Sequence, residues 1–348
     1  MIEFWFGVAA VMLAAYVILD GFDLGAGALH LFVARTDAER RQVLAAIGPF
    51  WDGNEVWLLA LGGVLFVAFP HVLASGLSGF YFAIFLVLWS LMLRAVSLEF
   101  RSHLESRLWR AAWDAIFSIA SALLPVLFGV ALGNLLRGVP LDSSGWFAIS
   151  LFTDFSTSDP VGLLDWYTVL VGVFALAALT AHGALFLAWK TDTLVQARAR
   201  LAATWCYLLV AILWPLLTWT TSAVHPDLFG MLTRRPIALA TTALAMAGLI
   251  TVGFGLRSAR YLIAFIGSSA FLVGVLAATA ASVFPVMLRA TGGDSLSLTA
   301  YNAGAPLSSL RSALGWWLVG FPIAIAYFVT LFRLHRGKAQ AAVGREGY

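Results

Sequence analysis

A set of ionisable side chains lies inside or beside long apolar runs. The stretch GPFWDGNEVWL carries Asp52 and Glu55, and the run LLALGGVLFVAF follows it directly. Asp20 and Asp23 lie in the later part of an N-terminal apolar run, and Arg94 lies in a third run. A charge at the centre of a membrane helix costs about 2.5–3.5 kcal/mol on insertion scales, so it is retained where it is paired or functional.

Spacing and charge balance indicate what these groups can do. Asp20 and Asp23 are three residues apart, so they share one helix face and line one pocket. Arg94 is the one fixed cation expected within a span, and it can neutralise one carboxylate. Because acids outnumber bases, we expect at least one acid to hold a proton at neutral pH. A row of protonatable acids is what a proton path requires.

Other polar residues have a simpler interpretation. An acidic residue in a first turn favours the helix dipole, so Glu55 and Asp114 can be ordinary N-terminal charges. We favour this simpler interpretation for Asp114, and a helix-end position for Glu99. The supporting residues of the expected site are Trp51, Trp57, His182 and Asp114.

Glycines accompany the first pair of acids. Gly21 and Gly25, with Gly27 beyond them, form a face of small residues beside Asp20 and Asp23. Such a face lets two membrane helices pack closely. A close helix pair at this position would keep the carboxylates away from lipid.

The histidines are few for a haem protein. Four of the six fall in loops or at the ends of spans: His71, His103, His225 and His335. His30 and His182 are left, and hydrogen-bonded core histidines are the favoured interpretation of both. The sequence has no Cys-x-x-Cys-His, no Cys/His metal spacing, no phosphate loop and no nucleophile elbow. We therefore expect no cofactor, metal or catalytic site within this chain.

Composition identifies the elements that must position these groups. The chain has 348 residues, 61% hydrophobic and 11% charged, whereas soluble domains carry about 25% charge. Apolar runs long enough to cross roughly 30 Å of hydrocarbon recur. These features predict an all-α polytopic membrane protein, because a transmembrane barrel would show short alternating segments. The basic residues lie in short loops, so the charge of +3 implies no nucleic-acid partner.

Nine transmembrane helices are predicted, at about 4–33, 48–70, 73–99, 111–136, 161–188, 201–223, 236–256, 260–287 and 310–333. We expect one membrane domain over 1–348, with helices 1–4 at 1–138, an outer loop at 139–160, helices 5–8 at 161–288, an outer loop at 289–309 and helix 9 at 310–334. The N-terminus has Glu3 and no Lys or Arg before its apolar run, so it is expected to be a retained span.

The distribution of Lys and Arg predicts the orientation. Fifteen fall on one side of the predicted spans: Arg35, Arg40, Arg41, Arg101, Arg107, Arg110, Lys190, Arg198, Arg200, Arg257, Arg260, Arg333, Arg336, Lys338 and Arg345. Five fall on the other: Arg137, Arg234, Arg235, Arg289 and Arg311. We therefore expect the N-terminus outside, the C-terminus in the cytoplasm, and every intramembrane ionisable group in the cytoplasmic half.

Two motifs in this order and spacing, GFDLGAG and GPFWDGNEVWL, resemble subunit II of the cytochrome bd-type quinol oxidases, including the cyanide-insensitive type. The resemblance continues through GFYFAIFLVLWSLMLRAVSLEFRS, WRAAWD and GVALGNLLRGVP. It weakens between about 141 and 280, apart from HGALFLAWKT, and returns in FPVMLRATGGDSLSLTAYNAG.

The resemblance implies a nine-helix subunit that forms a heterodimer with subunit I in the lipid of the bacterial inner membrane, which a small accessory subunit can join. In that family subunit I binds the haems, two of b type and usually one of d type, and the quinol, while subunit II normally carries no haem ligand. The implied enzyme is an electrogenic quinol:O2 oxidoreductase of aerobic respiration. It generates proton-motive force, and this chain alone holds no complete catalytic site.

The family's functional positions can be carried over to this sequence. Its acids in GFD and WDG correspond to Asp23 and Asp52, and its arginine in the third helix corresponds to Arg94. The resemblance implies that subunit II stabilises subunit I and contributes a cytosolic proton route for reduction of O2 to water. Asp52 is expected at its mouth, with Asp23 and Asp20 deeper, and Glu55 either joins the route or orients its neighbours.

A proton-coupled membrane transporter is the alternative, since it would also need buried acids. Transporters often show inverted repeats and broken helices at matching positions of two halves. Here the buried acids are confined to the first half of the chain, which disfavours that alternative. A third interpretation, an independent b-type cytochrome, is limited by the number of histidines.

Overall fold

The computed structural model describes residues 1–340, so Arg345 of the larger basic group lies outside the described residues. Its helices are α1 (Ile2–Val33), α2 (Asp37–Ile47), α3 (Trp51–Ala68), α4 (Pro70–Gly79), α5 (Tyr81–Phe100), α6 (Arg107–Arg137), α7 (Trp166–Lys190), α8 (Thr193–Val224), α9 (Pro226–Arg234), α10 (Pro236–Arg257), α11 (Tyr261–Val283) and α12 (Leu307–Leu334). A 3-10 turn (Asp294–Leu296) joins the antiparallel strands β1 (Val286–Leu288) and β2 (Leu298–Thr299).

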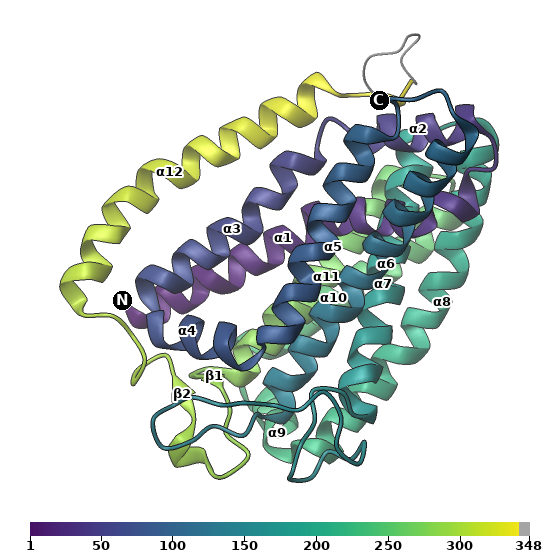
Figure 1. Cartoon of the computed structure of the whole chain (residues 1–348). Helices are drawn as coiled ribbons and strands as arrows, with labels where there is room; N and C mark the ends of the chain where they lie inside the picture. Colours follow the sequence, from purple (N-terminus) through teal and green to yellow (C-terminus); the bar gives the residue numbers. More distant parts are fainter. Residues whose placement is uncertain (341–348) are drawn as a thin grey trace.

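The long helices run between two ends of the molecule. One end carries α2 and the close of α12, and the other carries α9, β1 and β2 (Figure 1); we call these the α2 end and the α9 end. Eight helices in the described part are long and apolar enough to cross a membrane, or nine if the bent pair α2–α3 is one span. The predicted all-α polytopic membrane fold is therefore confirmed.

The structure differs from the prediction at the second and third spans. The second, predicted at 48–70, corresponds to α3, and the separate helix α2 precedes it and meets it at 45°. Thr36 starts α2 with a capping box in which its hydroxyl accepts from the backbone N–H of Glu39. The third is divided at Phe80 into α4 and α5. A Cβ on Gly79 would lie 2.1 Å from the ring of Phe147, so the missing side chain leaves room for the loop between α6 and α7 to pack at this break.

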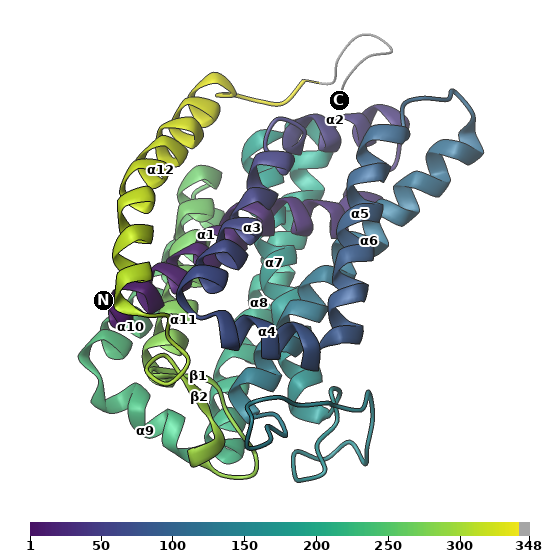
Figure 2. The same ribbon diagram turned by 60° about the vertical axis from the view of Figure 1, so that its left-hand side comes forward.

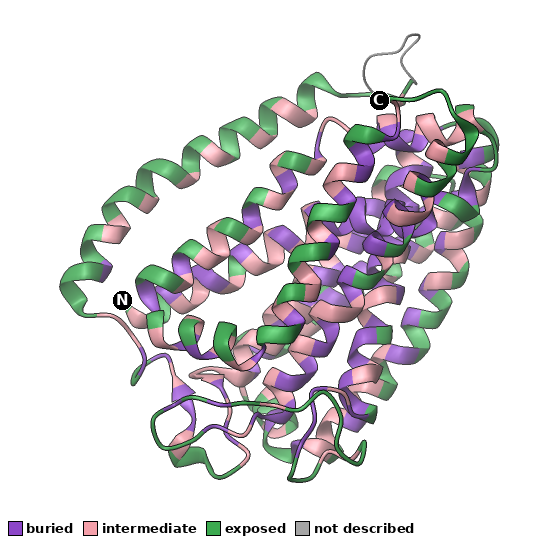
Figure 3. Cartoon of the chain, viewed as in Figure 1, coloured by how far each residue is buried: buried purple, intermediate pink, exposed green. Residues whose placement is uncertain are grey.

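The helix α1 lies at the centre of the bundle and contacts α3, α6, α7 and α11 (Figure 1, Figure 2). Every residue from Asp20 to His30 is buried. The exposed residues of the molecule gather instead on peripheral elements, and α12 is largely exposed along its length (Figure 3). The charged half of α1 is thus enclosed by protein.

The glycines of α1 allow the neighbouring helices to pack closely against it. A Cβ on Gly25 would lie 1.9 Å from the carbonyl oxygen of Leu179 in α7, and a Cβ on Gly183 would lie 2.3 Å from the backbone nitrogen of Ala26. These two helices therefore meet backbone to backbone. Gly27 turns to α6, where its Cβ would lie 2.2 Å from the Ser121 hydroxyl. The predicted small-residue face packs against two helices.

The helix α12 lies at the edge of the bundle and packs loosely against it. It meets α3 through large rings, with Trp57 5.4 Å from Phe328 and 6.3 Å from Phe321 between ring centroids. An apolar groove of about 800 Å³ lies between α12 and the helices α1 and α3. Near its start, the Trp5 indole N–H donates to the Leu310 carbonyl at 3.3 Å. This helix is held by rings and end contacts instead of a close backbone crossing.

The α1–α7 crossing generates a prediction. Gly25→Ala forces a methyl group into the Leu179 carbonyl, and overpacking of this kind costs typically about 1–3 kcal/mol. We expect the variant to yield less folded protein and to melt at a lower temperature in detergent. Gly7→Ala, on the same helix with nothing within 4 Å of its Cβ, is the matched control. Equal melting temperatures of the two variants would contradict the crossing.

Candidate functional site

The buried cation Arg94 organises the first polar cluster. Its Nη1 lies 2.7 Å from Oδ1 of Asp20, and its Nη2 donates to Oε1 of Glu55. The side chains of Arg94 and Asp20 are 1% and 0% exposed, whereas that of Glu55 is 26% exposed. The helices α1, α3 and α5 therefore meet at one guanidinium. Arg94 takes two carboxylates, one more than the sequence predicted.

A second carboxylate of α1 joins the same cluster through an amide. The Asn54 Nδ2 donates to Oδ2 of Asp23 at 2.7 Å and to the Leu19 carbonyl at 3.0 Å. Asp20 and Asp23 share one helix face with Tyr16, one turn earlier. Besides Asp20 Oδ1, which is in the ion pair with Arg94, four buried oxygens here have no hydrogen-bond partner within the described residues: Tyr16 Oη, Asp20 Oδ2, Asp23 Oδ1 and Asn54 Oδ1. The cluster thus keeps free capacity to accept or hold a proton.

The residues at the start of α3 lie in different surroundings. Asp52 is exposed and makes no hydrogen bond or ion pair with another residue in 1–340. Trp51 packs against the core, and Trp57 is buried and faces α12. Asp52, Glu55 and Asp20 are respectively exposed, partly exposed and buried. These three carboxylates form a series of increasing burial, from the surface to the interior.

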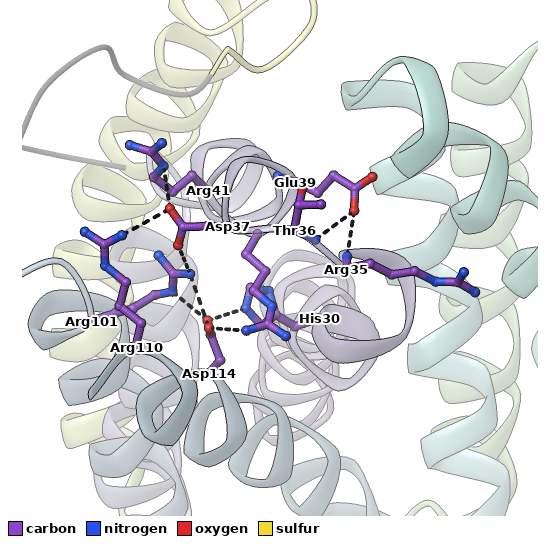
Figure 4. A network of polar contacts seen from close by, with 10 residues as sticks. His30, Arg35, Thr36, Asp37, Glu39, Arg41, Arg101, Arg110 and Asp114 are labelled. Atoms are coloured by element: carbon purple, nitrogen blue, oxygen red, sulfur yellow. Dashed lines mark hydrogen bonds and ion pairs between the residues drawn. The ribbon is translucent and has the colours of Figure 1, made fainter. Parts of the chain in front are cut away.

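A second cluster centres on Asp114 at the α2 end (Figure 4). Its oxygens lie 2.6 Å from Nε2 of His30, 2.6 Å from Nε of Arg101 and 2.9 Å from Nη1 of Arg40. Arg101 also donates to Asp37 at 2.8 Å. Asp114 lies about two turns inside α6, so the interpretation as an N-terminal helix charge is wrong. The sequence predicts the start of this helix at about residue 111, three residues before Asp114, whereas α6 begins at Arg107, seven residues before it.

The two deep histidines belong to separate polar clusters. His30 is enclosed beside Phe117, with its Nε2 on Asp114. His182 has both ring nitrogens engaged, Nε2 with the Ile18 carbonyl at 3.0 Å and Nδ1 with the Ser268 hydroxyl at 2.5 Å. His30 Nδ1 has no hydrogen-bond partner within residues 1–340. Among the described residues, no group of three His, Cys, Asp or Glu is arranged to hold a metal ion.

Lys190 is placed differently from the sequence prediction, which put it in a loop. It is the last residue of α7 and is 2% exposed. Its ammonium donates to the His335 carbonyl at 2.5 Å and lies 5.5 Å from the centroid of the Phe50 ring. Lys338 in turn donates to the Trp189 carbonyl at 2.7 Å. The segment after α12 is therefore fastened to the end of α7.

Fold and clusters together define a polytopic membrane subunit that holds a buried arginine–carboxylate cluster near one end of its bundle. The chain belongs to the family of cytochrome bd terminal oxidase subunit II, whose model matches residues 1–335. The resemblance given by its motifs is thereby confirmed.

Several relatives support this membership. The chain is 32% identical to a probable cytochrome oxidase subunit 2 of Haemophilus influenzae, over 97% of this chain and 94% of that one. It is 39% identical to subunit 2 of the cytochrome bd-I ubiquinol oxidase of Escherichia coli, over 57% of this chain and 51% of that one. The Bacillus subtilis cytochrome bd ubiquinol oxidase subunit 2 is 36% identical, over 57% of this chain and 56% of that one. These relatives are parts of an oxidoreductase complex.

A solved structure shares the fold. The bd oxidase from Geobacillus thermodenitrificans contains a chain that superposes with a TM-score of 0.73 at 16% sequence identity, covering 96% of this chain and 98% of that one. The arrangement of helices is therefore common to both chains.

The Arg94 cluster generates a second prediction. Arg94→Ala leaves Asp20 and Glu55 without their cation, and breaking a buried pair costs about 3–5 kcal/mol. We expect a large loss of folded, assembled protein, measured as the yield of monodisperse complex after purification. Adding Asp20→Asn should recover part of it.

The matched control is Arg200→Ala, because Arg200 is exposed on α8. Lys190→Ala would be a poor control, since that side chain is buried and bonded. Equal yields from the Arg94 and Arg200 variants would contradict the charge pairing.

Proposed function

We propose that this chain is the subunit of a quinol:O2 oxidoreductase that stabilises a haem-bearing subunit I and supplies it with protons from the cytosol. The observation that carries the proposal is the sequence of carboxylates from exposed Asp52 through Glu55 to buried Asp20 and Asp23, arranged about Arg94. Reduction of O2 to water consumes four protons per molecule, and they must enter a low-dielectric interior.

Charge balance in this cluster favours a mobile proton. Asp20, Asp23 and Glu55 are three carboxyl groups around the single guanidinium of Arg94. If all three were ionised, the cluster would hold two uncompensated negative charges, at a cost of several kcal/mol each in the interior. Holding at least one proton removes that cost. A group that holds a proton next to an unoccupied acceptor oxygen is suited to pass it on.

The positive-inside rule favours the cytosol as the source of the protons. The α2 end carries arginines that enter ion pairs around α2: Arg40, Arg41, Arg101, Arg110 and Arg198. Asp52 opens near this end, because α3 begins just after α2. In this orientation the carboxylates rise from the cytosolic surface into the membrane.

An apolar face beside the cluster is suited to a partner subunit. The helix α5, which directs Arg94 inward, exposes large side chains on its other side: Tyr81, Phe85, Leu88, Trp89 and Met92. In α3, which carries Glu55, Leu59 and Phe66 are 75% and 69% exposed. We place subunit I against α3 and α5. Docking there would bring its site of O2 reduction close to the Arg94 cluster. The haems and the quinol belong to subunit I in this proposal.

The assembly role predicts a simple spectrum. The chain purified alone should show no Soret band, and the haem spectrum should appear only after co-expression with subunit I. Both ring nitrogens of His182 and the Nε2 of His30 are engaged in other bonds, and both rings are 0% exposed, which is the reason for this expectation. A stoichiometric haem in the isolated chain that is lost on changing either histidine would refute it.

The proton role predicts a separation of turnover from assembly. Asparagine keeps nearly the shape and polarity of aspartate but cannot exchange a proton at neutral pH. Asp52→Asn and Asp23→Asn should therefore lower quinol-dependent oxygen uptake per haem while haem content stays near normal. Asp227→Asn, an exposed carboxylate at the α9 end, is the control and should not change turnover. Normal turnover per haem in both test variants would remove these carboxylates from the route.

A further inference from the structure

Two successive backbone carbonyls of α1 accept side-chain hydrogen bonds from two other helices. The Ile18 carbonyl accepts from Nε2 of His182 in α7, and the Leu19 carbonyl accepts from Nδ2 of Asn54 in α3, both at 3.0 Å. The next residue is Asp20, the buried partner of Arg94. The turn of α1 that precedes the carboxylates is thus held from two sides.

The hydrogen bonds of His182 have a fixed direction. A carbonyl oxygen can only accept, so Nε2 carries the proton and Nδ1 accepts from the Ser268 hydroxyl at 2.5 Å. The Tyr207 hydroxyl in turn donates to Ser268. The chain of donors therefore runs from α8 through α11 and α7 to α1. Because it ends on a carbonyl, it cannot deliver a proton to an acid, and its effect is on position.

Packing holds the imidazole ring in this orientation. The His182 ring is 0% exposed and stacks on Phe265, with centroids 4.7 Å apart and planes 14° apart. Phe22 of α1 covers it from 6.4 Å. A ring enclosed in this way keeps one rotamer, so its N–H is directed at the Ile18 carbonyl without a further ordering cost.

The amide of Asn54 is held in the same manner. Its Nδ2 donates both to the Leu19 carbonyl and to Oδ2 of Asp23 at 2.7 Å, which fixes which end of the amide faces α1. Successive carbonyls of an α-helix point about 100° apart around its axis. Rotation of α1 in either direction would therefore lengthen at least one of the two bonds.

We propose that His182 is a positioning residue that forms, with Asn54, a clamp on the Ile18 and Leu19 carbonyls. The clamp fixes the rotation of α1 and so places Asp20 against Arg94 and Asp23 against Asn54. It deepens the proposed function, on which its consequence for turnover rests. The Gly25–Gly183 crossing fixes the distance between α1 and α7, and the clamp fixes the angle.

A pair of substitutions at one position separates the two bonds of His182. In His182→Gln the side-chain amide reaches the position of Nε2 and keeps a donor for the Ile18 carbonyl. In His182→Asn the shorter amide keeps a partner for Ser268 but no longer reaches Ile18. Both are tested in the complex with subunit I. The readout is the rate at which dicyclohexylcarbodiimide, which modifies protonated buried carboxyl groups, labels the peptide containing Asp20 and Asp23, measured by mass spectrometry.

We expect His182→Gln to label at the wild-type rate and His182→Asn to label about fivefold faster, the factor that loss of one net hydrogen bond gives. If the Gln variant assembles with subunit I and the Asn variant does not, that result would also support the clamp. Wild-type labelling in both variants, or an equal change in both, would overturn it. If neither variant assembles, the stacked ring and not its N–H holds α1, and the proposal also fails.

Oxygen uptake per haem in the same preparations tests the proposed function separately. Faster labelling together with slower turnover in His182→Asn supports both the clamp and the proton route. Faster labelling with unchanged turnover keeps the clamp and removes the α1 carboxylates from the route. A turnover defect that the Gln variant rescues, with a pH profile like that of wild type, supports positioning of the carboxylates by this donor.

Discussion

The guanidinium of Arg94 cannot lose its proton at any physiological pH, so a positive charge is fixed inside the apolar part of the chain. Asp20 and Glu55 neutralise it from two other helices, and the surrounding helices must exclude lipid from all three side chains. The close crossing at Gly25 and the burial of α1 from Asp20 to His30 satisfy that requirement. The burial of α1 and the choice of small residues on it follow from holding one charge in a medium that disfavours charge.

The carboxylates of the two charged clusters that adjoin α1 differ in how completely they are paired. Asp114 receives donors from His30, Arg40 and Arg101, a degree of satisfaction typical of a structural network. Asp20 and Asp23 each keep one buried oxygen without a hydrogen-bond partner in the described residues. An incompletely satisfied network is expensive and is expected where a group must change its protonation state. The fully paired carboxylate thus lies at the α2 end, and the incompletely paired ones lie about two to three turns nearer the start of α1.

The sequence alone identifies buried charged residues where they lie deep in an apolar run. Asp20, Asp23 and Arg94 stood out for that reason, and the fold class followed from the recurrence of such runs. Partners were harder, because the contacts of Asp114 with Arg40 and Arg101 join segments that local spacing does not relate. Lys190 is a similar case, since its burial depends on a segment from the other end of the chain. Breaks such as that at Phe80 depend on packing by a distant loop and left no sign in the hydropathy.

The contact between α1 and α7 has a consequence for biosynthesis. Ile18 and His182 are 164 residues apart, so at about 5–20 residues per second the ribosome needs roughly ten to thirty seconds between them. The first span leaves the ribosome before its cation on α5 and before the helix that presses against its glycines. During this interval its carboxylates lack the environment that later neutralises them, and protonation or retention at the insertion machinery must compensate. The order in which the translocon releases these helices is thus a kinetic constraint that the finished fold imposes on its own synthesis.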